Sequence, residues 1–375
     1  MHRPTLALLI CAACGSPADD TTAASTSSPA ETAAETAADT AAETATTAAE
    51  TPTTGEPATT AGTTDDATTA DADPCNDSPQ ALADCVERQR WEDDIGLIAD
   101  IRTPGSPHWQ AVQDLCADRL TEYGYEVQLF DYGTGINVLG RRVGAAMPEQ
   151  QVVIGAHYDH IDDCHGADDN ASGVAALLEV ARVLALAEFD RTVLVACWDE
   201  EELGLVGSEA YVAAATANGD QIVVNFNYDM IGYYSDQPNT QTVPAGFDLA
   251  FPDAAAELVT NEYRGDFIAA ISDAESHDHS VALGAAADRI GLRKALLELP
   301  ADTESTEVFA DLRRSDHASF WDAGYNAIFL SDSGEFRNPH YHCMGGPDEV
   351  SDLTAQFATD VARITVEASA IALGL

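Results

Sequence analysis

The sequence has very little positive charge. Its 375 residues include 17 lysines and arginines against 64 aspartates and glutamates, which gives a formal net charge of -47, and Lys294 is its only lysine. Nucleic acids and anionic membrane surfaces would repel such a chain, because both carry dense negative charge. We therefore exclude both as partners and note that divalent cations suit an acidic chain.

The chain also lacks, near its start, an apolar run long enough to cross a bilayer. Residues 1–14 read MHRPTLALLICAAC, with Arg3 before a short apolar run, which is typical of an export signal. The CAAC at 11–14 resembles a bacterial lipobox ending at an acylated Cys14, although Cys11 stands where leucine is usual. We expect an exported lipoprotein at the outer membrane or cell surface; the alternative is a periplasmic or secreted protein.

Residues 15–74 contain no aromatic residue, no leucine and no basic residue. A segment of Thr, Ala, Glu, Asp and Pro cannot bury enough apolar surface to offset the conformational entropy lost on folding. We expect a disordered linker over 15–74, whose acids are solvated charge, and one folded domain over 75–375.

Cysteine is scarce, with eight residues in all. Cysteines of exported proteins commonly pair, but spacing does not determine which ones do. Cys75 and Cys85 could close a small loop, and a bridge between Cys164 and Cys343 is a second option. Cys116 and Cys197 are candidates for buried thiols.

Strand-like and helix-like segments alternate through the folded domain. Helical spacing of apolar residues predicts helices at 108–123, 171–187, 207–216, 276–289 and 351–373. Alternating or continuous apolar runs predict strands at 126–131, 136–142, 151–156, 192–198, 222–228 and 325–332. This alternation predicts an α/β fold, a three-layer α/β/α sandwich with a mixed, largely parallel sheet.

Acids and histidines follow three of the predicted strands. The stretch AHYDHIDDCHGADDNASG covers 156–173, DEEE covers 199–202, and Asp229 follows the strand at 222–228. Because the carboxyl ends of parallel strands meet at one edge of a sheet, we expect these side chains to converge. Converging carboxylates need a compensating cation, and imidazole with carboxylate predicts Zn²⁺, with Mn²⁺ or Co²⁺ as substitutes.

Two pairs suggest a division of roles. His157 and Asp159 lie two residues apart, so Asp159 can hold the second ring nitrogen of His157; a surface histidine beside an accidental acid is the alternative. One of Glu201 and Glu202 can ligate a metal while the other faces its water, whereas an isolated pair would more often be a solvated turn.

A calcium loop is a formal alternative for the first stretch, because Asp168, Asn170, Ser172, Gly173 and Glu179 fit its spacing. Such a loop needs an entering helix, and a strand is predicted there instead. We therefore reject it.

The motifs GAHYDH, GADDNASG, DEEELGLVGS, NYDMIG and NPHYHC, in this order, resemble those of metallopeptidase family 28. The resemblance covers about 150–345. It implies an eight-stranded mixed sheet between helices and a pair of zinc ions at the carboxyl edge of the sheet.

The resemblance also implies roles for single residues. One zinc would be held by His157 and Asp229, the other by Glu202 and His342, and Asp169, followed by a cis peptide bond, would bridge both. The catalytic residues would be Glu201 as general base, Tyr341 as oxyanion donor and Asp159 behind His157. In RRSDHASFWDAG, Ser315 or Asp316 is expected to cap a helix. His317 is expected to contact a metal ligand and not to bind a metal itself.

Together these residues predict a zinc-dependent exopeptidase in which a two-metal-activated water attacks the peptide bond. Clustered acids attract an amino group, which favours an aminopeptidase acting on peptides with a free N-terminus. The alternatives are a carboxypeptidase, for which Arg313, Arg314 and Arg337 are candidate carboxylate-binding residues, a one-zinc glutaminyl cyclase, and a catalytically silent binding module.

Overall fold

The computed structural model describes residues 74–76, 78–301, 303 and 306–375. The signal peptide expected over 1–14 and, apart from Pro74, the linker expected over 15–74 lie outside these residues. Among the residues described, no helix has both the length and the apolarity needed to span a membrane.

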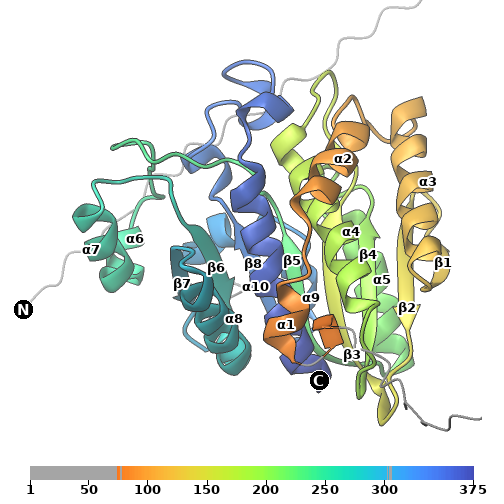
Figure 1. Cartoon of the computed structure of the whole chain (residues 1–375). Helices are drawn as coiled ribbons and strands as arrows, with labels where there is room; N and C mark the ends of the chain where they lie inside the picture. The colour runs from red at the N-terminus through yellow and green to blue at the C-terminus, as the bar shows by residue number, and fades with distance from the viewer. Residues whose placement is uncertain (1–73, 77, 302, 304–305) are drawn as a thin grey trace, which may run out of the picture. The chain divides into compact units, whose positions relative to one another are not determined.

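The described part is built on one eight-stranded sheet (Figure 1). Its strands are β1 (Glu126–Asp131), β2 (Ile136–Arg142), β3 (Met147–His157), β4 (Arg191–Trp198), β5 (Gln221–Tyr228), β6 (Ile268–Ser272), β7 (Lys294–Glu298) and β8 (Ala327–Ser331). They lie in the order β1-β2-β4-β3-β5-β8-β6-β7. The pairs β1–β2, β2–β4 and β6–β8 are antiparallel and the other neighbours are parallel, so the predicted mixed sheet is confirmed.

Helices cover both faces of this sheet (Figure 1). They are α1 (Pro79–Ala83), α2 (Arg88–Ile98), α3 (Pro107–Glu122), α4 (Gly173–Leu184), α5 (Val206–Asn218), α6 (Phe247–Ala250), α7 (Pro252–Thr260), α8 (His277–Ile290), α9 (His317–Asp322) and α10 (Ala355–Leu373).

Two apolar clusters separate the sheet from its helices. Val193 and Val195 of β4 pack with residues of α1, α2, α3, α4, α8 and α10. Leu194 and Ala196 of the same strand pack with residues of α5, α6, α7 and α9. Because successive side chains of a strand point to opposite faces, these clusters are two separate layers, which confirms the predicted three-layer sandwich.

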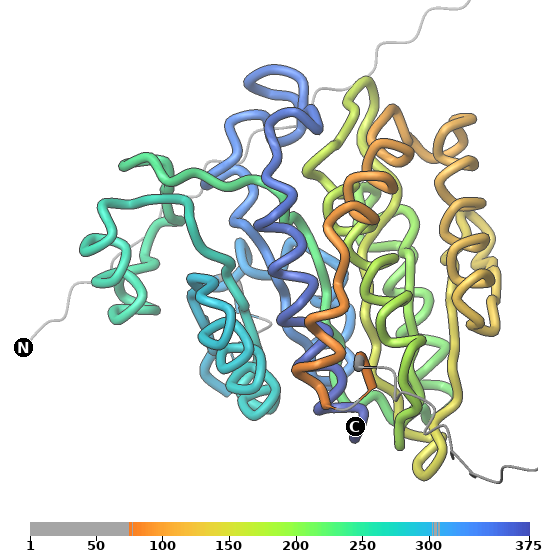
Figure 2. The backbone as a smooth tube through the Cα atoms, viewed as in Figure 1, coloured from red at the N-terminus to blue at the C-terminus, as the bar shows by residue number. Residues whose placement is uncertain are grey.

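The first and last helices lie side by side (Figure 2), since α1 packs against α10. Gln80 of α1 donates a hydrogen bond of 2.9 Å to Glu367 of α10. The start of the folded domain is therefore anchored on its C-terminal helix.

Two strands and two α-helices between residues 233 and 315 were not predicted. They are β6, β7, α6 and α7, and the two strands have five residues each. Short apolar runs of this length do not distinguish strand from helix. This region nevertheless completes one end of the sheet.

The cysteines pair as two of the options considered. Disulfides join Cys75 to Cys85 and Cys164 to Cys343. Cys116 and Cys197 are free thiols and are buried.

Candidate metal centre

The predicted ligands gather at the carboxyl edge of three neighbouring strands. His157 is the last residue of β3, Glu202 lies on the turn after β4, and Asp229 directly follows β5. Asp169 lies in the short irregular turn η2 (Ala167–Ser172) that leads into α4, and His342 lies between β8 and α10. The peptide bond after Asp169 is cis, as expected, and so is the bond between Asp229 and Met230.

Asp169 lies at the centre of this group. Its Oδ1 atom is 3.4 Å from Nε2 of His157, and its Oδ2 atom is 3.2 Å from Nε2 of His342. His157 Nε2 is also 3.7 Å from Oδ1 of Asp229, and His342 Nε2 is 3.3 Å from Oε2 of Glu202. The five predicted ligands thus form two donor groups that share Asp169.

These distances suit zinc. Tetrahedral zinc with bonds of about 2.0–2.1 Å keeps its donor atoms about 3.3–3.4 Å apart. In addition, Nε2 of His157 is buried and makes no hydrogen bond within the described residues. A buried imidazole nitrogen without a partner, facing carboxylates at this spacing, fits a metal ligand.

The acids of the cluster attract positive charge. Burial disfavours the charged form of His342, but Asp169 and Glu202 raise its pKa to about 10. Burial also opposes the charge on His157, whereas Glu201 and Asp169 hold its pKa well above the ordinary value. Burial acts to raise the pKa of Asp169, but the neighbouring imidazoles of His157 and His342 hold it well below its usual range. A cluster that draws protons onto two imidazoles favours cations at the same places.

A buried arginine supplies part of the positive charge that compensates the clustered carboxylates, whereas only metal ions were expected to do so. Arg102 has no exposed surface and donates to the carbonyl oxygens of Tyr158 at 3.0 Å, Gly166 at 2.8 Å and Asp169 at 3.0 Å. It therefore ties the loop that carries Asp169 to the end of β3. A lone arginine upstream of every motif gave no signal of this role.

Asp159 makes its clearest bonds with the turn after β4. Its carboxylate accepts hydrogen bonds from the backbone nitrogens of Glu201 at 3.0 Å and Glu202 at 3.2 Å. The same carboxylate is 3.5 Å from Nδ1 of His157, and the Asp159 carbonyl oxygen is 3.2 Å from that nitrogen. Asp159 thus lies beside His157, as expected, and also holds the two adjacent glutamates.

Tyr341 lies against the second donor group, which is formed by Asp169, Glu202 and His342. Its ring stacks on that of His342, with centroids 3.9 Å apart. Nη2 of Arg314 donates to the Tyr341 hydroxyl oxygen at 3.0 Å, and Nη1 of Arg314 pairs with Glu335 at 2.8 Å. Burial raises the pKa of Tyr341, so its hydroxyl keeps its proton.

Two further acids, neither of which was expected in this role, hold the turn that carries Asp169. The Asp168 carboxylate accepts hydrogen bonds from the backbone nitrogen of Gly232 at 2.9 Å and from Asn338 at 2.8 Å. The Asp348 carboxylate accepts from the backbone nitrogens of Asp168 and Asp169 at 2.9 and 3.2 Å. Asp168 was visible as the neighbour of Asp169, whereas Asp348 lies far along the chain without a motif.

His317 does not support the ligands as expected. Its Nε2 atom is 2.9 Å from the carbonyl oxygen of Leu312, and its ring stacks on Phe329 at 4.3 Å. Asp316 stands at the N-cap of α9, but its side chain makes no capping hydrogen bond. His317 therefore packs against the face of the sheet.

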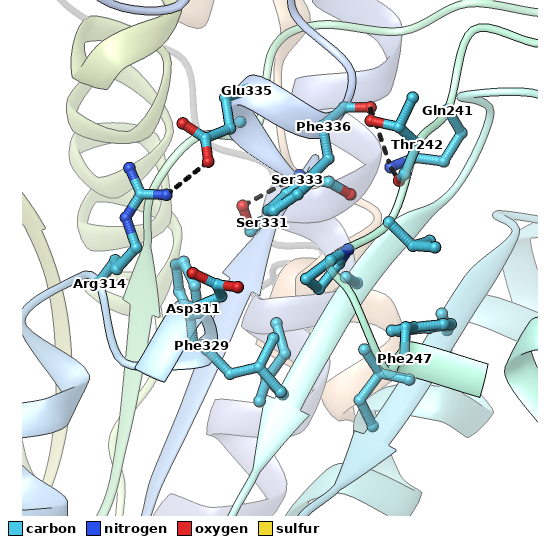
Figure 3. A pocket seen from close by; sticks show the side chains of 18 of the residues that line it. Gln241, Thr242, Phe247, Asp311, Arg314, Phe329, Ser331, Ser333, Glu335 and Phe336 are labelled. Atoms are coloured by element: carbon cyan, nitrogen blue, oxygen red, sulfur yellow. Dashed lines mark hydrogen bonds and ion pairs between the residues drawn. The ribbon is translucent and has the colours of Figure 1, made fainter. Parts of the chain in front are cut away.

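A pocket lined by Phe247, Phe329 and Arg314, among others, is drawn in Figure 3. It has a volume of about 870 Å³ including its mouth, and it lies beside the donor groups because Asp229 and Tyr341 line it. Its walls are largely apolar and include Phe247, Leu258, Phe267, Ile271, Leu297 and Phe329. A substrate bond held at the donor groups would thus have an apolar pocket beside it.

A model of Peptidase family M28 matches residues 137–368, more than half of the chain. The chain is 30% identical over 209 residues to the uncharacterized protein YfbL of Escherichia coli (strain K12), a match covering 52% of this chain and 59% of YfbL. It is 35% identical over 109 residues to Aminopeptidase YwaD of Bacillus subtilis (strain 168), covering 28% of this chain and 24% of YwaD. The matched parts are less than two thirds of either relative.

A similar fold occurs in the LapA aminopeptidase of Legionella pneumophila. The TM-score is 0.60 and the sequence identity 19%, and the match covers 79% of this chain and 73% of LapA. At this identity the likeness concerns the fold.

Proposed function

We propose that this chain, which belongs to peptidase family M28 as its motifs predicted, is a zinc-dependent aminopeptidase that removes large apolar residues from the N-termini of peptides. The observation that carries the proposal is the position of Asp169, whose two carboxylate oxygens face His157 and His342. One carboxylate shared by two donor groups fits a pair of metal ions.

In this proposal His157 and Asp229 would hold one zinc ion, Glu202 and His342 would hold the other, and Asp169 would serve both. Bound there, the ions would polarise the scissile carbonyl and make a water molecule more acidic. Mn²⁺ or Co²⁺ would suit the same oxygen and nitrogen donors.

Glu201 acts as the general base. Its carboxylate lies within 4.8 Å of the donor atoms of His157 and Asp229. Burial raises its pKa well above the usual value, although the charge of His157 opposes this. Glu201 would take the proton of the attacking water and pass it to the leaving amine.

Tyr341 donates to the oxyanion that develops on the scissile carbonyl. Because Arg314 already donates to the Tyr341 hydroxyl oxygen, the hydroxyl proton is left to point elsewhere. The stacking on His342 keeps this hydroxyl near the second donor group.

The apolar pocket would receive the side chain of the substrate's N-terminal residue, while Glu201 and Asp229 hold its amino group. Asp229 belongs to the donor cluster and also lines the pocket. Burying a leucine or phenylalanine side chain contributes about 1.5–3 kcal/mol, which corresponds to roughly tenfold or more in kcat/KM over alanine.

The three arginines considered for a substrate carboxylate are engaged with partners. Arg313 pairs with Asp322 at 2.7 Å, and the buried Arg337 donates to Gln241 at 2.7 Å. Arg314 lines the pocket but pairs with Glu335. This favours an aminopeptidase over a carboxypeptidase.

The test is zinc reconstitution followed by assays with leucyl, phenylalanyl and alanyl peptides and their N-acetylated forms. We expect two zinc ions per chain, cleavage of the free peptides only, and the preference for leucine and phenylalanine given above. Release of C-terminal residues from acetylated peptides would identify a carboxypeptidase, and cyclisation of N-terminal glutamine with one zinc would identify a glutaminyl cyclase. Full zinc loading with no turnover would leave a binding module.

Export and lipid attachment through Cys14, a residue outside the described part of the chain, are also proposed. They rest on the N-terminal sequence alone. Labelled palmitate should mark the full chain and not its Cys14→Ser variant, and only the former should sediment with membranes. An unlabelled wild-type chain would contradict the lipid anchor.

A further inference from the structure

His160 is a buried histidine beside the donor groups that the proposed mechanism does not use. It lies three residues beyond His157, has no exposed surface, and its Nδ1 atom is 2.8 Å from Oε1 of Glu202. A carboxylate oxygen without a proton only accepts hydrogen bonds, so Nδ1 of His160 carries the proton.

The two oxygens of Glu202 have different partners. Oε1 faces His160, whereas Oε2 is 3.3 Å from Nε2 of His342 and so belongs to the second donor group. A carboxylate that ligates through one oxygen leaves the other oxygen to be held by the protein. Such outer partners orient the ligand and raise metal affinity.

The surroundings of His160 fix its ring. The backbone nitrogen of His160 donates to the carbonyl oxygen of Arg102 at 3.2 Å. Gly166 has a φ of 55°, and a Cβ atom there would lie 2.5 Å from Cδ2 and 2.7 Å from Cγ of the His160 ring. The ring edge also meets that of His342, with centroids 5.8 Å apart. A glycine is therefore required for the ring to stay where its Nδ1 atom faces Glu202.

We propose that His160 is a positioning residue for the second metal ion: it donates from Nδ1 to Oε1 of Glu202 and thereby keeps Oε2 in place to ligate. This inference rests on the proposed two-metal site. Nε2 of His160 is buried and makes no hydrogen bond within the described residues, and a ring nitrogen of His160 lies within 4.8 Å of carboxylate oxygens of Asp169 and Glu202. The alternative role, in which the ring itself ligates the metal, is therefore decided by substitutions of His160.

Three substitutions of His160 test this role. In H160N the side-chain amide can stand where Nδ1 stands and still donate to Glu202, in H160Q it stands nearer the place of Nε2, and H160L has no donor. The control is H165N, because His165 lies on the same loop but its side chain is 43% exposed and pairs with Glu349. Zinc affinity is measured by competition with a fluorescent zinc chelator, and apo-protein unfolding checks the fold.

We expect H160L and H160Q to bind the second zinc about 10–100-fold more weakly. The first zinc should be unaffected, and H160N and H165N should stay close to the wild type. If H160L does not fold, the comparison of H160N with H160Q decides. If H160Q binds the second zinc with wild-type affinity, His160 has only a packing role. If H160N binds the second zinc as weakly as H160Q does, the ring itself ligates the zinc. Either result overturns the inference.

The readout separates this inference from the proposed function. A wild-type chain that binds two zinc ions but cleaves no peptide would contradict the proposed function while the comparison of His160 variants still stands. A wild-type chain that binds only one zinc would overturn both.

Discussion

Two adjacent glutamates of the candidate metal centre, Glu201 and Glu202, lie near different residues. The carboxylate of Glu201 lies with the ligand atoms of His157 and Asp229, whereas that of Glu202 lies with the ligand atoms of Asp169 and His160. Neighbouring side chains of an extended strand would point to opposite faces. Here Glu200 has a φ of 55°, so the chain turns, and Asp159 holds the next two backbone nitrogens. Both carboxylates therefore reach the same cluster.

This division predicts separable effects of two neighbouring substitutions. Glu201→Gln should keep two zinc ions and lower kcat by roughly 10²–10⁴, as loss of a general base does. Glu202→Gln should instead lose the second zinc. Zinc content by elemental analysis and kcat with a leucyl peptide measure the two effects, and undiminished hydrolysis by Glu201→Gln would remove Glu201 from the mechanism.

At the scale of elements, two of the proposed metal ligands lie on loops, outside the hydrogen-bonded helices and strands. The loop between β3 and α4 carries Asp169, and the loop between β8 and α10 carries His342. The Cys164–Cys343 disulfide joins these two loops across a sequence separation of 179 residues. Cys343 directly follows His342, so the disulfide limits how far this ligand can move from Asp169.

Replacing both cysteines of this bridge by serine should therefore affect stability and metal binding together. The free energy of unfolding should fall by about 2–4 kcal/mol, because the unfolded chain gains freedom, and the second zinc should bind more weakly. The matched control replaces Cys75 and Cys85, whose separation is 10 residues, and should leave zinc affinity unchanged. Denaturant unfolding and chelator competition are the measurements; equal zinc affinity in both double variants would contradict the prediction.

At the scale of the whole molecule, two arginines and several histidines of an acidic chain are buried. The net charge of -47 leaves the surface strongly acidic, while Arg102 and Arg337 are buried. His317 is also buried, and burial lowers its pKa to about 3. In the unfolded chain its pKa would be about 6.5.

The low pKa of His317 predicts a loss of stability in mild acid. Between about pH 3 and 6.5 the unfolded chain binds one more proton at this residue than the folded chain, so the free energy of unfolding rises with pH there and falls as pH drops below 6.5. The loss is at most about 1.4 kcal/mol per pH unit. Denaturant unfolding from pH 7 to 5 should show a steeper fall in the wild type than in His317→Gln, which cannot titrate and shares every other charge. Parallel curves would contradict this.

Much of the fold could be predicted because long elements carry strong patterns. The predicted helix at 108–123 is α3, and the predicted strands at 126–131 and 136–142 are β1 and β2. Short elements such as β6 and β7 carried too few residues for a pattern. The role expected for His317 was wrong, because a motif position does not show which way its side chain packs.

The sequence by itself determined the family, six of the eight strands and the residues that converge at the carboxyl edge of the sheet, because each of these residues lies at or just beyond the end of a strand or within a motif of fixed spacing. The tertiary structure alone decided which oxygen of Asp169 faces which imidazole, that Arg102 ties the loop of Asp169 to β3, and that His160 holds Glu202. These contacts join side chains from separate loops, and their geometry depends on how those loops pack, which spacing along the chain does not encode.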